Sequence, residues 1–162
     1  MADERIEVVG VDHIYLTVSD FTRAERFYDT VLGLLDFRKS DREIAGAPHR
    51  HYFNKVVQIT IRPARDGYHP YDSYSPGLHH LCLQVGTPAD VDRFAAALKA
   101  RGLSTSVPAF HKEYADDYYA TFFEDPDGLR HEVMARRAGR DLIVERWDEL
   151  TDFLNPVQKL KA

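Results

Sequence analysis

The sequence DHIYLTV at residues 12–18 returns in a similar form as HHLCLQV at residues 79–85. In both stretches a histidine is followed by apolar residues at every second position, which is the pattern of a β-strand with one buried face. The likeness continues at the same spacing, because RF at residues 26–27 corresponds to RF at residues 93–94. A repeat of this kind predicts two copies of one supersecondary unit in the chain.

A helix is expected directly after each of these strands. The first helix has Ser19 or Asp20 as its N-cap and Gly33 at its end, and the second has Thr87 as its N-cap followed by Pro88. The apolar stripes with helical spacing are Ala24, Phe27, Tyr28 and Val31 in the first helix and Val91, Phe94, Ala95 and Leu98 in the second.

Shorter β-like runs follow each helix. They are residues 35–39, 50–54 and 56–62 in the first copy and residues 105–107, 118–124 and 130–135 in the second. The last two runs are joined by DPDG at residues 125–128, which is typical of a type I turn. The element order is therefore βαβββ, twice. It predicts an α+β fold in which two tandem βαβββ modules form a curved mixed sheet that lines a cleft.

The chain is expected to be a single domain, residues 1–162. Module one covers residues 6–63, a linker rich in Gly, Pro, Tyr and Asp covers residues 64–76, and module two covers residues 77–136. A C-terminal helical extension is expected at residues 140–155, where it would clamp the sheet or a partner subunit. The apolar residues available for that packing are Leu142, Trp147, Leu150 and Leu154.

Composition narrows the class of protein. The 44% hydrophobic content of the 162 residues is that of an ordinary globular domain, and no apolar run is long enough for a signal peptide or a membrane span. We therefore expect a cytoplasmic location. A formal charge of −5 without a basic stripe argues against a nucleic-acid partner. The single cysteine, Cys82, lies in an apolar run and is expected to be a buried, unreactive thiol.

Three residues are candidates for a metal site. If the two modules are related by approximate two-fold symmetry, their first strands meet at equivalent places, which would bring His13 and His80 together. Imidazole nitrogens in a cleft are natural metal ligands. Glu132, just after the 125–128 turn, is a carboxylate inside a β-like run, and metal ligation would explain its presence there. An outward-facing, solvated glutamate is the alternative.

The residues resemble a known family in three places. DHI at residues 12–14, with FY and LGL after it, is similar to the opening of the vicinal oxygen chelate (VOC) superfamily, and GLHHL at residues 77–81 is similar to the opening of its second module. FFEDPDG at residues 122–128, with Glu132 four residues after the glycine, is similar to its ending. This superfamily includes glyoxalase I, methylmalonyl-CoA epimerase, extradiol dioxygenases and the fosfomycin and bleomycin resistance proteins. The likeness covers residues 6–136.

The resemblance implies a glyoxalase-like fold and one divalent metal ion, held by His13, by His80 rather than His79, and by Glu132. Glyoxalase I has a glutamate as its fourth ligand, in the last strand of the first module. The corresponding run, residues 56–62, contains no carboxylate, and strand alternation puts Gln58 on one face with Thr60 and Arg62. Gln58 is the candidate for the fourth ligand, with a non-ligating role as the alternative.

Three functions are compatible with this set. The first is a lyase or isomerase of the glyoxalase or epimerase type, in which the metal (Fe, Mn, Ni, Co, Zn or Mg) chelates neighbouring oxygens of a small carbonyl substrate and Glu132 or another group is the base. The second is an Fe(II)-dependent extradiol dioxygenase, with His111 and Tyr119 as acid–base residues and Tyr118 as the alternative tyrosine, although Phe122 stands where that signature has tyrosine. The third is a metal-free drug- or metabolite-binding protein of the bleomycin-resistance type, a branch that typically lacks these ligands.

The remaining expectations concern the partners and the other histidines. The partner is expected to be a small-molecule substrate, and the chain is expected to pair as a homodimer because small curved sheets leave edges exposed. His79 and His131 each adjoin a proposed ligand, so alternation would direct them to the opposite face. They are expected to lie at the surface or next to the metal ligands without binding the metal, as are His49, His51 and His69.

Overall fold

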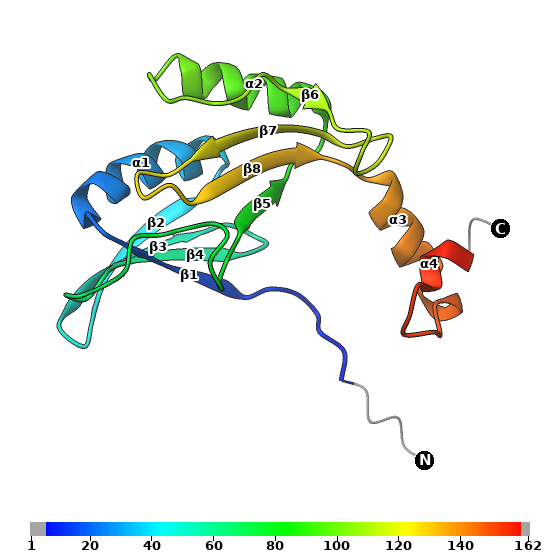
Figure 1. Ribbon diagram of the computed structural model, residues 1–162, viewed down its shortest axis with the longest axis horizontal. Coiled ribbons are helices and arrows are strands. Elements are labelled where there is room, and N and C mark those ends of the chain that lie inside the picture. Colours follow the sequence, from blue (N-terminus) through cyan, green and yellow to red (C-terminus); the bar gives the residue numbers. More distant parts are fainter. Residues whose placement is uncertain (1–5, 160–162) are drawn as a thin grey trace. The chain divides into compact units, whose positions relative to one another are not determined.

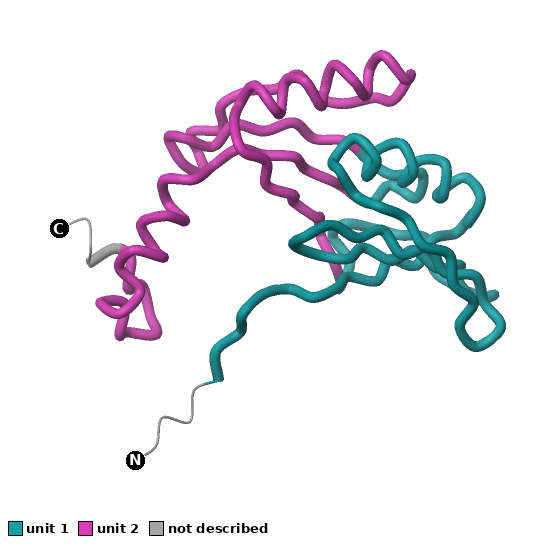
Figure 2. The backbone as a smooth tube through the Cα atoms, turned by 180° about the vertical axis from the view of Figure 1, so that it is seen from behind, with its two compact units in different colours: residues 1–77, 124–129 teal, residues 78–123, 130–162 magenta. Residues whose placement is uncertain are grey.

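The computed structural model describes residues 6–159, which form two compact units (Figures 1 and 2). Within the described residues, unit 1 comprises residues 6–77 together with Glu124–Leu129, and unit 2 comprises Leu78–Phe123 together with residues 130–159. Each unit contains one mixed four-stranded sheet and one long helix. The two βαβββ modules of the α+β prediction are confirmed.

Unit 1 is built from β1 (His13–Val18), α1 (Phe21–Leu34), β2 (Arg38–Ile44), β3 (Ala47–Phe53) and β4 (Gln58–Pro63). The strand order is β1-β4-β3-β2, with β1 parallel to β4 and the other pairs antiparallel. Asp20 caps α1 by accepting a hydrogen bond from the backbone N–H of Arg23, and the predicted apolar stripe of α1 is buried. The core of the unit also contains Leu16, Val18, Ile59 and Ile61.

Unit 2 repeats the plan with β5 (His80–Gln84), α2 (Pro88–Lys99), β6 (Ala109–Phe110), β7 (Tyr119–Glu124) and β8 (Arg130–Ala135), in the strand order β5-β8-β7-β6. Strands β5 and β8 are parallel. Thr87 and Asp90 form a capping box at the start of α2, and the predicted stripe of this helix is also buried.

The turn at residues 125–128 has the expected form. The Gly128 N–H donates to the carbonyl of Asp125 over 3.0 Å, and Gly128 adopts a positive φ of 86°. The turn is anchored to the residues around α1, because the Tyr28 hydroxyl donates to the Asp125 carboxylate over 2.7 Å and the Ser19 N–H donates to Asp127 over 2.8 Å.

Two predicted strands are placed differently. Residues 35–37 belong to the end of α1 and a turn at Asp36, whose φ is 62°, so β2 begins only at Arg38. Residues 105–107 do not form a strand. The Ser106 N–H does reach the carbonyl of Phe122 at 2.8 Å, but Pro108 follows and has no N–H to continue a ladder, so β6 is confined to Ala109–Phe110.

The C-terminal extension also differs from the prediction of one helix over residues 140–155. Helix α3 covers Ala138–Glu145, a 3-10 turn covers Trp147–Glu149, and a short helix α4 covers Pro156–Lys159. The apolar stripe is interrupted where α3 ends, and Trp147 and Leu154 remain 67% and 74% exposed. Within residues 6–159, none of the helices has both the length and the apolar character needed to cross a membrane.

Candidate metal centre and pocket

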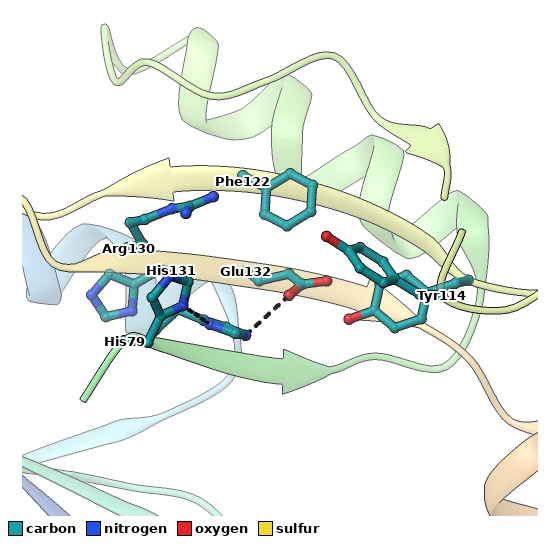
Figure 3. A pocket seen from close by; sticks show the side chains of 8 residues that line it. His79, Tyr114, Phe122, Arg130, His131 and Glu132 are labelled. Atoms are coloured by element: carbon teal, nitrogen blue, oxygen red, sulfur yellow. Dashed lines mark hydrogen bonds and ion pairs between the residues drawn. The ribbon is translucent and has the colours of Figure 1, made fainter. Parts of the chain in front are cut away.

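A pocket of about 300 Å³ opens on the sheet of unit 2 (Figure 3). Figure 3 shows Glu132 projecting from β8 into this pocket, with Phe122 on one side and Tyr114 on another. The residues that line it come from β5 and the residue before it, from β7, from β8 and from the loop before β7, and they are His79, His80, Tyr114, Tyr118, Phe122, Arg130, His131 and Glu132.

His80 and Glu132 are brought together by the parallel pairing of β5 with β8. His80 lies opposite Arg130 and Cys82 lies opposite Glu132, so His80 and Glu132 point to the same face of the sheet. Their nearest atoms, His80 Nε2 and Glu132 Oε2, are 3.8 Å apart. Glu132 is only 3% exposed, and its Oε1 accepts no hydrogen bond from any other described residue. A buried carboxylate oxygen without a donor is costly unless a cation or a ligand satisfies it.

The second nitrogen of His80 is engaged by its neighbour in the chain. His80 Nδ1 lies 2.7 Å from His79 Nδ1, so one of these atoms donates a hydrogen bond to the other. When His80 Nδ1 is the donor, its Nε2 carries the lone pair and faces Glu132. The expectation that His79 lies on the opposite face was wrong. His79 precedes the first residue of β5, so strand alternation does not apply to it.

His13 and Gln58 are the two candidate ligands in unit 1. They are direct partners across the parallel strands β1 and β4, and Gln58 shares its face with Thr60 and Arg62 as alternation predicts. His13 Nδ1 is bonded to the Asp12 carboxylate at 2.8 Å, which leaves Nε2 free of that contact. The side-chain Nε2 of Gln58 contacts His51 and Thr60 at 3.0 Å, so both contacts use the amide nitrogen and not the amide oxygen.

The two units have the same strand register, but they carry different residues at the fourth ligand position. In unit 1, Thr60 lies opposite Tyr15, which is two residues after His13, and in unit 2 Glu132 lies opposite Cys82, which is two residues after His80. The residue equivalent to Glu132 is therefore Thr60, and Gln58 is equivalent to Arg130. Within either unit, the described residues contain no group of three His, Cys, Asp or Glu side chains placed to hold a metal ion.

Comparison with known proteins identifies the family. The model of the Glyoxalase/Bleomycin resistance protein/Dioxygenase superfamily matches residues 10–133, which include both modules. The chain belongs to this superfamily. The resemblance seen in the three sequence motifs is thereby confirmed.

Two relatives match most of the chain. The uncharacterized protein YqjT of Bacillus subtilis is 28% identical over 126 residues, which are 76% of this chain and 96% of YqjT. The virulence protein STM3117 of Salmonella typhimurium is 26% identical over 126 residues, which are 76% of this chain and 81% of that protein.

Solved structures of other proteins share the fold. A glyoxylase/bleomycin resistance protein/dioxygenase domain from Frankia sp. EAN1pec has a TM-score of 0.68 and 24% identity, and covers 81% of this chain and all (100%) of its own. A mutant of the fosfomycin resistance protein FosX from Listeria monocytogenes, complexed with Mn(II) and 1S,2S-dihydroxypropylphosphonic acid, has a TM-score of 0.62 and 16% identity. It covers 84% of this chain and 98% of its own.

In this superfamily member, the aromatic wall of the pocket includes Tyr118. Burial, followed by a hydrogen bond to Glu132, raises the pKa of the Tyr118 hydroxyl far above its usual value. Burial, followed by the charge of Glu132, raises the pKa of the Cys82 thiol to about 12. Both groups are therefore protonated near neutral pH, and Cys82 carries no thiolate for nucleophilic chemistry.

The two other predicted catalytic residues lie outside the lining of the pocket. Tyr119 donates a hydrogen bond to Asp92 over 2.8 Å, so Tyr118, its neighbour, is the tyrosine that meets Glu132. His111 lies against the aromatic wall, since its ring centroid is 5.1 Å from that of Phe122, and its Nδ1 is bonded to Glu113 at 3.1 Å. Strand alternation distinguishes Tyr118 from Tyr119 only when the register of β7 is known.

His131 was expected at the surface or beside the ligands, and the structure buries it to 5% exposure. Its ring stacks on Phe123 at a centroid distance of 5.3 Å, and Phe123 in turn contacts Phe94 of α2. Burial lowers the pKa of His131 to about 4, so this histidine is neutral near pH 7.

Proposed function

We propose that this protein is a divalent-metal-dependent enzyme of the lyase or isomerase type, acting on a small substrate with two neighbouring oxygens. The ligands in this proposal are His13 and Gln58 from one unit and His80 and Glu132 from the other, each pair supplying half of a four-ligand set. Whether both halves come from one chain or from two copies in a homodimer is part of the proposal's test.

One observation carries the proposal: in each pair the atom suited to bind a metal is left free while the other polar atom is held. His13 and His80 are engaged through Nδ1, which leaves Nε2 in both. Gln58 is engaged through its amide nitrogen, which leaves the oxygen. Such hydrogen bonds to the non-ligating atom fix the orientation of metal ligands in many metalloproteins.

Glu132 supplies the charge that a cation needs. Its carboxylate is buried, Oε2 lies toward His80, and Oε1 accepts no hydrogen bond from the rest of the described chain. Two imidazole nitrogens, one amide oxygen and one carboxylate suit Mn²⁺, Fe²⁺, Co²⁺, Ni²⁺ or Zn²⁺, and also Mg²⁺ when water completes the set. The donor set therefore fits a divalent metal.

A bound cation would act as a Lewis acid that polarises both substrate oxygens and stabilises negative charge on them. The protein's own groups would do the rest. The Glu132 carboxylate lines the pocket, and its Oε1 accepts no hydrogen bond from residues 6–159, so this carboxylate would accept a proton from a substrate carbon or water. Tyr118, which stays protonated, would donate a hydrogen bond, and the rings of Tyr114 and Phe122 would exclude water.

The test is metal analysis of full-length protein purified without chelators, for the wild type, His13→Ala, His80→Ala and the control His69→Ala. His69 lies in the linker, is exposed, and is absent from the proposed ligand set. We expect about one metal per site in the wild type and the control and loss of metal in the other two variants. Absence of metal from the wild type, even after soaking with divalent ions, would refute the proposal and leave the metal-free binding protein as the best account.

A second candidate, an Fe(II)-dependent extradiol dioxygenase, is favoured by the position of His111 against the pocket wall. With Gln58 in place of a carboxylate, the set also contains the two histidines and one carboxylate typical of non-haem iron enzymes. The same purification separates the two candidates. Iron together with oxygen uptake on a panel of catechols would support the dioxygenase, and another metal without oxygen uptake would support the lyase or isomerase.

A further inference from the structure

The sheet of unit 1 has two faces of different chemistry. Its pairing register aligns residues across all four strands, so that side chains in one row share a face. The first row contains the proposed ligands Gln58 and His13 together with Arg38 and Phe53, the next contains Ser40, His51, Thr60 and Tyr15, and the third contains Arg42, His49, Arg62 and Thr17. We call these three rows the open face, because α1 covers the opposite side with its buried apolar stripe.

Cations on the helix side of the sheet are neutralised within the unit. Lys39 contacts the carboxylates of Glu25 at 2.5 Å and Asp29 at 3.0 Å, and Arg50 contacts Glu25 at 2.6 Å. These interactions raise the pKa of both cations and, against the effect of burial, lower the pKa of Glu25.

The open face contains no carboxylate that could neutralise its cations. Its three rows contain three arginines and three histidines but no aspartate or glutamate. Arg38 pairs with Asp36, which lies outside the sheet, at 2.8 Å. Among residues 6–159, Arg62 Nε has no hydrogen-bond acceptor, and neither Arg42 nor Arg62 forms an ion pair with an acidic side chain. Two guanidinium groups on one face are thus left without counter-charges.

Arg62 is the more informative of the two arginines, because water does not reach its whole side chain. The residue is half-buried, and its Nε is shielded from solvent without a hydrogen-bond acceptor among residues 6–159. Folded proteins satisfy nearly all of their buried N–H groups, so an acceptor is expected here. Across β3 the register continues from Arg50 opposite Ile61 to His49 beside Arg62, and His49 is itself buried.

We infer that the open face of unit 1 is an anion subsite, in which Arg62, assisted by Arg42, binds an acidic group of the small-molecule substrate. This inference rests on the proposed function, because the acidic group is assigned to the substrate that the proposed metal site would bind. A guanidinium group recognises carboxylate and phosphoryl oxygens through paired N–H donors. An oxygen acceptor of this kind is what Arg62 Nε lacks among the described residues.

The position of Arg62 also sets the shape of that substrate. Arg62 follows Gln58 by four residues in β4, which is about 13 Å along a strand. The acidic group therefore lies away from the pair of oxygens that the proposed metal site would bind. The substrate class is a small extended acid with its carboxylate or phosphoryl group at one end and its reacting oxygens at the other.

The test is titration of full-length, metal-free protein with inorganic phosphate or acetate, followed by backbone amide NMR shifts and referenced to chloride at equal ionic strength. The variants are Arg62→Gln and Arg42→Gln, and the matched control is Arg26→Gln, which removes the same charge from an exposed position of α1. We expect saturable shifts in β3 and β4 of the wild type. Binding should weaken about tenfold or more in Arg62→Gln and change less than about twofold in the control.

Each outcome decides the inference. A preference for phosphate over acetate would assign a phosphoryl group and the reverse a carboxylate. Shifts that do not saturate, or that match between Arg62→Gln, Arg42→Gln and the control, would overturn the subsite. Arg42 is exposed, so its variant tests the idea even if Arg62→Gln does not fold. Because the titration is done without metal, its failure is separate from a failure of the metal analysis, which tests the proposed function.

Discussion

Replacing Glu132 with glutamine should change the stability of the metal-free protein and its affinity for metal in opposite directions. The wild-type carboxylate is buried, and its Oε1 has no hydrogen-bond donor among the described residues. An unsatisfied buried polar atom costs about 1–3 kcal/mol, and a charged one costs more. Removing the charge while keeping the shape should relieve part of this cost, so we expect Glu132→Gln to be more stable by about 1 kcal/mol in EDTA.

The metal response should be reversed. A ligand present at 100 times its dissociation constant stabilises the folded state by about 2.7 kcal/mol. We expect Mn²⁺ to stabilise the wild type in this way and to have almost no effect on Glu132→Gln, because the variant lacks the anionic ligand. Loss of a carboxylate from the ligand set should weaken binding by at least about 100-fold, given that losing a supporting hydrogen bond already costs about 10- to 100-fold.

The assay is thermal unfolding followed by circular dichroism, in EDTA and in a Mn²⁺ series. A change of 1 kcal/mol corresponds to about 2–4 °C in Tm for a chain of this size. Glu124→Gln is the control, since Glu124 is exposed at the end of β7 and its replacement changes the charge equally. A variant that loses stability in EDTA, or one that Mn²⁺ stabilises as strongly as the wild type, would refute the reasoning.

Three further predictions follow from other parts of the structure. Tyr28→Phe should lower the free energy of unfolding by about 1.5–3 kcal/mol, measured by urea denaturation, because the substitution removes a buried hydrogen bond to the Asp125 carboxylate. The control is Tyr74→Phe, at an exposed tyrosine, which should change the free energy of unfolding little. Burial lowers the pKa of His131 from 6.5 to about 4, so the unfolded chain binds the proton more readily, and the free energy of unfolding should fall by about 3 kcal/mol as the pH drops from 6.5 to 4. The loss should be absent from His131→Gln when its unfolding is measured over the same pH range. The same pH dependence in the variant and the wild type would contradict the buried, neutral state. Mixing His13→Ala with His80→Ala should restore metal binding in part if each site is completed by two copies of the chain, whereas no recovery after co-refolding would place all ligands of a site in one chain.

The local sequence was a good guide to elements whose signals lie close together along the chain. The caps at Asp20 and Thr87 and the apolar stripes of α1 and α2 were predicted correctly, because capping and helical spacing depend on residues within a few positions of each other. The C-terminal extension was predicted less well, since an apolar stripe does not fix where a helix stops when nothing buries it.

Predictions about which side chains meet were less complete. Tyr119 was favoured over Tyr118, and His79 was expected on the far face. Both positions depend on where a strand begins and how it is paired. A shift of one residue reverses the face of every side chain in a strand, and the sequence of that strand alone does not fix the shift. The sequence likewise did not predict that Arg62 Nε lacks an acceptor, because this depends on residues from other strands.

The sequence by itself determined the repeat, the βαβββ order and the identity of the proposed ligands, because these are patterns of residue type at fixed spacing. The tertiary structure decided the chemical state of the side chains. It buried Glu132 beside His80, held the Nδ1 atoms of two histidines, and left one face of a sheet rich in cations without carboxylates. Burial and pairing arise from strands distant in the chain, and they set both the cost of a charge and the ligand that can relieve it.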